Sequence, residues 1–74
     1  MSFADRLRAA RKGKNLTQQE LAKESGVAYR TLQNWENGSR RPVNITMVDK
    51  VAAALGISTT ELLDDGEIFV AEAG

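Results

Sequence analysis

The side chains of this chain that could do chemistry are limited in kind. Its 74 residues include no histidine and no cysteine. The imidazole bases, thiol nucleophiles and usual zinc ligands of many enzymes are therefore absent. The remaining side chains can act through hydrogen bonds and charge. One predicted helix has Leu32 and Trp35 on its apolar face. Its other face carries four side chains that can form such bonds: Tyr29, Arg30, Gln33 and Asn34. The sequence predicts a binding protein, not an enzyme, with no catalytic residue, no metal and no cofactor.

Charge is distributed unevenly along the chain. Ten basic and ten acidic residues give a formal net charge of zero. Nine of the basic residues precede Pro42, together with four acidic residues, whereas one basic and six acidic residues follow it. A binding partner meets the local field and not the average of the whole chain. The basic N-terminal part therefore predicts an anionic partner.

Turn and capping signals divide the chain into short helices. A chain of this length holds a single small core. Thr17 and Glu20 form one capping box and Ser58 and Glu61 form another. We expect a first helix capped by Ser2 and stopped by Gly13, a second from Gln18 to about Glu24 and a third from Tyr29 to Asn37. A fourth helix would be capped by Asn44 and terminated by Gly56, and a short fifth would follow Ser58. The prediction is an all-α domain over residues 1–66.

The last residues, 67–74, carry Ile68, Phe69 and Val70 without a cap or a helical stripe. We interpret them as a C-terminal tail, which could be frayed, form an edge strand or pack on the domain. The longest apolar run, Val51 to Leu55, is too short to cross a bilayer, and the N-terminus lacks a signal-peptide pattern. We therefore expect no membrane association and a cytoplasmic location.

Several spaced motifs resemble one family. The resemblance covers roughly residues 3 to 64, and its motifs are Leu16 to Ala22, Gly26-Val27, Thr31-Leu32, Trp35 to Gly38, Arg41-Pro42, Ala54 to Ser58 and Glu61 to Leu63. Together they resemble the phage-repressor-like (Cro and XRE type) helix-turn-helix family. The resemblance implies a compact five-helix bundle of the lambda-repressor-like DNA-binding type, in which helices two and three form the helix-turn-helix. It further implies a transcription regulator, expected to be a repressor, that binds near-palindromic double-stranded DNA as a homodimer.

The resemblance also implies roles for individual residues. The third helix would enter the major groove, with Arg30 as the leading specificity residue, Tyr29 contacting a base or covering apolar surface, and Asn34 reading deeper than Gln33. Backbone contacts would come from Gln18 at the start of helix two and from Thr31, Asn37, Arg40 and Arg41. Thr31 could equally be a partly buried helix residue. Arg11 and Glu36 would pair across helices one and three, and Trp35 and Phe3 would belong to the core.

Two features depart from the family pattern. Ala28 stands where a serine or threonine commonly caps the recognition helix, and the C-terminal third is acidic.

A second hypothesis stays open beside the regulator: an antitoxin-type or bridging module on the same fold would use the 67–74 tail to bind a protein partner. Helix five, with Leu62 and Leu63, is the expected dimer surface.

Overall fold

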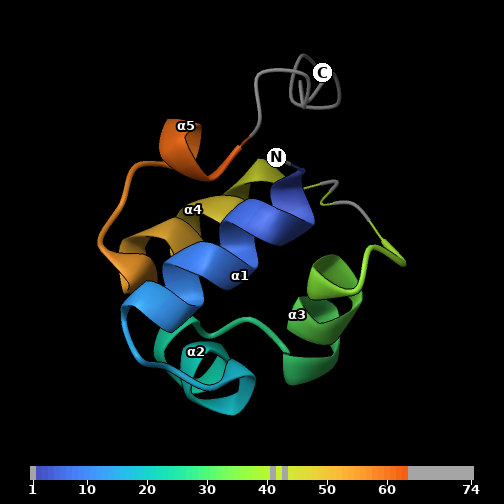
Figure 1. Cartoon of the computed structure of the whole chain (residues 1–74), viewed down its shortest axis with the longest axis horizontal. Coiled ribbons are helices and arrows are strands. Elements are labelled where there is room, and N and C mark those ends of the chain that lie inside the picture. The colour runs from blue at the N-terminus through green and yellow to red at the C-terminus, as the bar shows by residue number, and fades with distance from the viewer. Residues whose placement is uncertain (1, 41, 43, 64–74) are drawn as a thin grey trace.

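A computed structural model describes residues 2–40, 42 and 44–63 of the chain. These residues contain five helices (Figure 1). They are α1 (Phe3–Gly13), α2 (Gln18–Ser25), α3 (Tyr29–Glu36), α4 (Ile45–Leu55) and α5 (Thr59–Leu62). No strand occurs among these residues. The predicted all-α architecture is therefore confirmed.

Side-chain caps fix where four of the helices begin. Ser2 accepts a hydrogen bond from the backbone N–H of Asp5, and Asn44 accepts one from Thr46. Both predicted capping boxes are present, each with reciprocal bonds between its first and fourth residues. The exception is α3, since Ala28 provides no side-chain hydrogen bond, although the helix still begins at Tyr29 as predicted.

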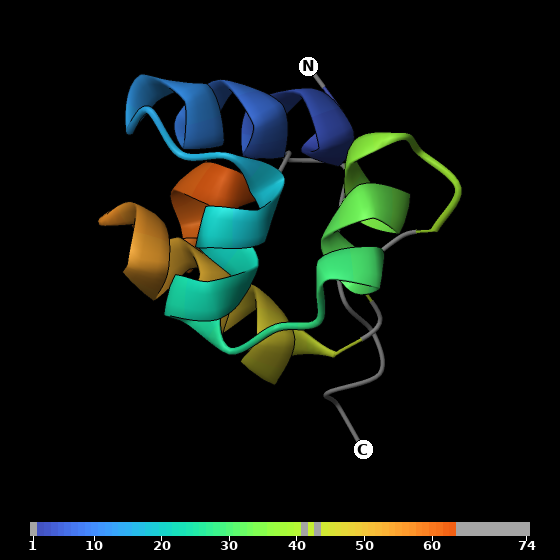
Figure 2. The ribbon, with the colours of Figure 1, turned by 90° about the horizontal axis from the view of Figure 1, so that it is seen from below.

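A single core joins the helices. Helix α3 packs against α1 and α2, and α4 packs against α2 and α5. Figure 2 shows α1 spanning one side of the molecule, with α3 near its N-terminal end. The Phe3 and Trp35 rings meet edge to face with centroids 5.4 Å apart. The buried hydrophobic residues among those described include both rings and are Phe3, Leu7, Leu21, Val27, Leu32, Trp35, Val48, Val51, Ala52, Leu55 and Leu62.

Helix ends differ from the prediction by one residue at two places. Helix α2 continues to Ser25, whose hydroxyl accepts a hydrogen bond from the N–H of Val27, and it ends at Gly26 with φ of 77°. Helix α3 ends at Glu36 and not at Asn37. The Asn37 side-chain oxygen accepts a hydrogen bond from the N–H of Ser39, which turns the chain out of the helix, and Gly38 follows with φ of 79°.

Some predictions fall outside the part of the chain that the structure describes. These are the backbone role of Arg41, the domain boundary at 66 and the tail at 67–74. Within the described ranges, no helix is both long and apolar enough to span a bilayer.

Candidate nucleic-acid interface

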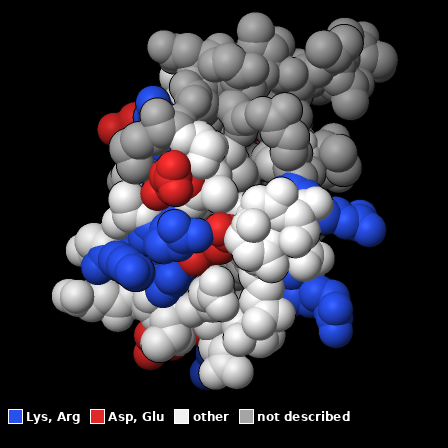
Figure 3. Space-filling view, turned by 45° about the vertical axis from the view of Figure 1, so that its right-hand side comes forward, with Lys and Arg blue, Asp and Glu red and all other residues white. Residues whose placement is uncertain are grey.

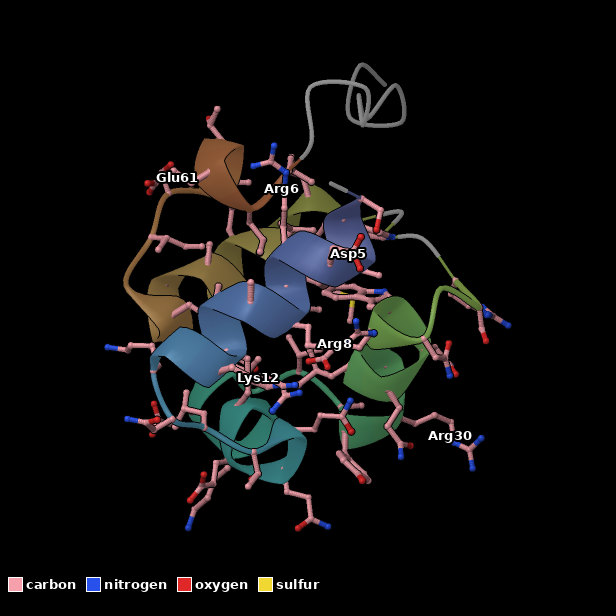
Figure 4. The ribbon with its side chains drawn as sticks, in the orientation of Figure 1. Asp5, Arg6, Arg8, Lys12, Arg30 and Glu61 are labelled. Carbon is pink, nitrogen blue, oxygen red and sulfur yellow. The ribbon has the colours of Figure 1, made fainter. Side chains whose placement is uncertain are left out.

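The orientation of α3 decides which of its side chains face outward. Leu32 and Trp35 are buried in the core, with exposed fractions of 0% and 4%. Because residues on the opposite face of a helix point away from such anchors, α3 presents its polar side chains to solvent. Arg30 extends away from the body of the molecule (Figure 4).

Four side chains proposed from the sequence as base readers lie on this outward surface. Tyr29 is 39% exposed, and among the described residues it is the one large hydrophobic side chain that is exposed. Arg30 is also exposed, whereas Gln33 and Asn34 are half-buried. None of the four side chains hydrogen-bonds to another described residue. Their donors and acceptors are therefore available to a partner.

The residues predicted to contact the DNA backbone differ in how far their side chains are exposed. Arg40 and Asn37 are exposed beyond the end of α3, and Thr31 is half-buried within it. The oxygen of Asn37 is occupied by Ser39, but its amide N–H groups have no partner among the described residues. The structure thus places Arg40 and Asn37 beside the polar surface of α3, and it agrees with Thr31 being partly buried.

Glu36 is a buried carboxylate that joins three helices. It is 3% exposed, and its Oε2 accepts a hydrogen bond from Nε of Arg11 at 2.6 Å. Its Oε1 accepts from Nη2 of Arg11 at 2.9 Å and from Nε2 of Gln18 at 3.1 Å. The predicted Arg11 and Glu36 pair is confirmed as a two-pronged contact, and Gln18 adds a link that the sequence did not indicate.

Arg11 is held charged in this setting. Hydrogen bonding to Glu36 raises the pKa of the Arg11 guanidinium above its ordinary value, although burial acts in the opposite direction. Arg11 also donates to the backbone oxygen of Leu16 at 2.8 Å. A group whose pKa is raised stabilises the fold below that pKa, so the Arg11 contribution does not vary across the neutral range.

The start of α2 lies next to this network. The backbone N–H groups of Thr17 and Glu20 are satisfied by the capping box. Those of Gln18 and Gln19 have no hydrogen bond within the described residues. Open amides at the positive end of a helix favour an anion there.

Two open recesses border these residues. One, of about 430 Å³, lies between α1, α2 and the end of α3, and its lining is Arg8, Arg11, Lys12, Gln18, Gln33, Glu36 and Asn37. The other, of about 470 Å³, lies beside Tyr29 and the start of α2. Figure 3 shows Lys and Arg side chains gathered on one part of this face with Asp and Glu side chains beside them, and further Lys and Arg side chains at the opposite edge across uncharged surface.

Sequence reasoning missed Arg8 and Lys12 as part of this face. Both lie on α1, four residues apart, and both line the first recess (Figure 4). The signal that could have found them is the spacing of Arg11 and Lys12 from Arg8, because residues three and four apart share one side of a helix.

Helices α2 and α3 are short and joined by a tight turn at Gly26, and α3 is held by its apolar face, so the two form a helix-turn-helix arrangement. The helix-turn-helix family model HTH_3 matches residues 7–62. The chain therefore belongs to this helix-turn-helix family of Cro/C1 and XRE type, a family of DNA-binding transcription regulators.

Known proteins similar to this chain are regulators. It is 32% identical over 69 residues to the HTH-type transcriptional activator BcrR of Enterococcus faecalis, covering 93% of this chain and 33% of BcrR. It is 31% identical over 70 residues to the cryptic phage CTXphi transcriptional repressor RstR of Vibrio cholerae, covering 95% of this chain and 62% of RstR. Among solved structures, the biofilm master regulator SinR in complex with DNA matches with a TM-score of 0.80 and 34% identity, covering 84% of this chain and 98% of SinR.

The similarity to SinR supports the helical architecture assigned to this chain. The SinR match extends over five-sixths of the chain at an identity well above that of unrelated proteins. The lambda-repressor-like architecture expected from the sequence is therefore confirmed. The chain spans one third of BcrR and less than two thirds of RstR.

Proposed function

We propose that this domain binds double-stranded DNA sequence-specifically, with α3 in the major groove. The observation that carries the proposal is the outward polar surface of α3, formed by Tyr29, Arg30, Gln33 and Asn34, whose side chains have no partner among the described residues. The major groove admits an α-helix and presents a donor and acceptor pattern that such side chains can read. SinR, a similar protein, was solved in complex with DNA.

Within this proposal, each outward side chain has a different task. Arg30 can donate two hydrogen bonds to O6 and N7 of guanine, and the amides of Asn34 and Gln33 can pair with N6 and N7 of adenine. Tyr29 lies at the first turn of α3, where its ring can contact a sugar or a thymine methyl group. Asn34, further from the N-terminus, reads the deeper position.

The DNA backbone would be held on both sides of α3. The open amides of Gln18 and Gln19 would bind a phosphate at the start of α2. The side chain of Gln18 keeps one amide hydrogen on Glu36 and has a second hydrogen to donate. Thr31, Asn37, Arg40 and Arg41 complete the proposed set of backbone contacts, which supplies affinity and register.

We further propose that two copies act together on a near-palindromic operator and repress transcription. A dimer reads half-sites about one helical turn apart, so that its two-fold symmetry matches the symmetry of the DNA. Leu62, expected from the sequence at the dimer surface, is instead buried in this chain's own core at 0% exposure, so half-buried Leu63, just after α5, supplies the apolar area on which the second copy would pack. The proposal of repression is supported by the likeness to RstR, which is a transcriptional repressor.

Replacing Arg30 with alanine should relax specificity at one base pair of each half-site. The lost two-bond contact with guanine corresponds to about 1–3 kcal/mol of discrimination, or roughly 5- to 150-fold in relative affinity at that position. Equilibrium binding to the preferred duplex and to its single-base variants measures this change.

Two control variants separate the loss of base reading from the loss of charge. Arg40→Ala should weaken all duplexes about equally, because Arg40 is proposed to contact the backbone. Lys50→Ala, an exposed position on α4 outside the helix-turn-helix, should leave discrimination unchanged. If Arg30→Ala weakened every duplex by the same factor, the assignment of Arg30 to a base would be wrong.

A further inference from the structure

The two ends of α3 are anchored very differently. At its N-terminus, Ala28 offers no side-chain cap. At its C-terminus, the last four carbonyl oxygens of a helix normally lack partners within the helix. Here the oxygens of Gln33, Asn34 and Trp35 accept from the backbone N–H groups of Asn37, Arg40 and Gly38, at 3.0, 3.2 and 3.4 Å. The C-terminal end of α3 therefore has its carbonyl oxygens paired, whereas its N-terminal end has no side-chain cap.

The fourth oxygen of this set is satisfied from another helix. Nη2 of Arg8, on α1, donates to the backbone oxygen of Glu36 at 2.5 Å. Nε of the same guanidinium lies 3.9 Å from Oε1 of Glu36, and Nη1 lies 3.6 Å from Oδ1 of Asp5. Asp5, one turn earlier on α1, thus adds an exposed ion pair to the same guanidinium.

We infer that Arg8 is a positioning residue, which fixes the end of α3 and so the angle at which the helix meets the bases. This inference rests on the proposed function. A cation at the negative end of a helix is favourable, and a planar fork aligns two groups at once, whereas a lysine ammonium acts as a point charge. Arg8 thereby acts on α3 through Glu36, without needing to touch DNA.

A substitution that keeps the positive charge can distinguish positioning of α3 by Arg8 from a direct contact between Arg8 and a phosphate. Arg8 lines the open recess and its side chain is 41% exposed, so a phosphate contact is the natural competing role. Lysine can replace arginine at a phosphate, but its single ammonium group cannot reproduce the guanidinium's hydrogen bond to the backbone oxygen of Glu36 together with its 3.9 Å ion-pair contact to the Glu36 carboxylate. A charge-conserving substitution therefore tests positioning alone.

The experiment compares Arg8→Lys with Lys12→Met in the full chain. Lys12 lies one turn along α1 in the same recess, is exposed and has no ion pair among the described residues. The probes are the duplex that the unmodified protein selects from a randomised pool and its single-base variants. Affinity is measured across a salt series, below the melting temperature of each variant, which is determined separately.

Arg8→Lys is expected to lower discrimination between the selected duplex and its variants by about 2- to 30-fold, the range of coupling through a contact network. Its slope of log affinity against log salt should equal that of the unmodified protein, because the charge is kept. Lys12→Met should show the opposite pattern, with a shallower slope and unchanged discrimination.

Two results would overturn the inference. Unchanged discrimination in Arg8→Lys with unchanged melting would show that the fork is not needed. Unchanged discrimination with a lowered melting temperature would show a role in stability alone. Failure of the unmodified protein to prefer any duplex would instead overturn the proposed function together with this inference.

Discussion

Replacing Glu36 with alanine is expected to cost about 3–5 kcal/mol of folding free energy, the penalty for breaking a buried ion pair from one side. Arg11, whose side chain is 12% exposed, would lose the carboxylate that receives its Nε and Nη2 hydrogen bonds. A core of this size supplies only about 3–5 kcal/mol in total. The variant should therefore be largely unfolded, as measured by circular dichroism through urea and thermal unfolding.

A matched control is available on α2. Glu24 is an exposed glutamate without an ion pair among the residues described, and Glu24→Ala should change stability by no more than about 0.5 kcal/mol. A double substitution, Arg11→Met with Glu36→Leu, should recover most of the loss because neither charge is then left buried alone. A cost below about 1 kcal/mol for Glu36→Ala would contradict the role assigned to the pair.

Affinity for DNA should fall steeply as salt is raised. With roughly four to six phosphates neutralised by each subunit, log affinity should fall by about 0.9 per phosphate for each unit of log salt. For a dimer this amounts to a loss of at least about 10⁴-fold between 50 and 200 mM salt. The basic first part of the chain supplies the charge.

The salt series should be run with the selected duplex and with an unrelated duplex of equal length. Parallel steep slopes are expected, offset by the sequence-specific contacts, since phosphates are common to both. A slope shallower than about −2 would mean that few phosphates are neutralised, which contradicts the proposed set of backbone contacts.

Local sequence was sufficient to predict most of the fold. The capping boxes at Thr17 and Ser58 involve residues three apart, and the glycine at Gly26 ends a helix through its own backbone freedom. Such signals need no knowledge of tertiary structure. The exact end of α3 was harder to predict from the sequence. It depends on the hydrogen bond from the N–H of Ser39 to the side chain of Asn37, which forms in place of one more helical residue.

The candidate site was only partly predictable, and the reason is sequence separation. The outward side chains of α3 follow from the positions of Leu32 and Trp35 on the opposite face. The pairing of Arg11 with Glu36 came from the family resemblance. The contacts of Glu36 with Gln18 and Arg8 join residues 18 and 28 positions apart, and they exist only because three helices converge there. No local pattern in the sequence encodes that convergence.

The measurement that tests the central claim most directly is a selection from a randomised pool of DNA duplexes, using purified protein at near-physiological salt and sequencing the retained molecules. We predict an enriched inverted repeat whose half-site centres lie about 10 base pairs apart, with a guanine at the position read by Arg30. Folded protein that retains no sequence above the starting pool would contradict sequence-specific DNA binding by α3.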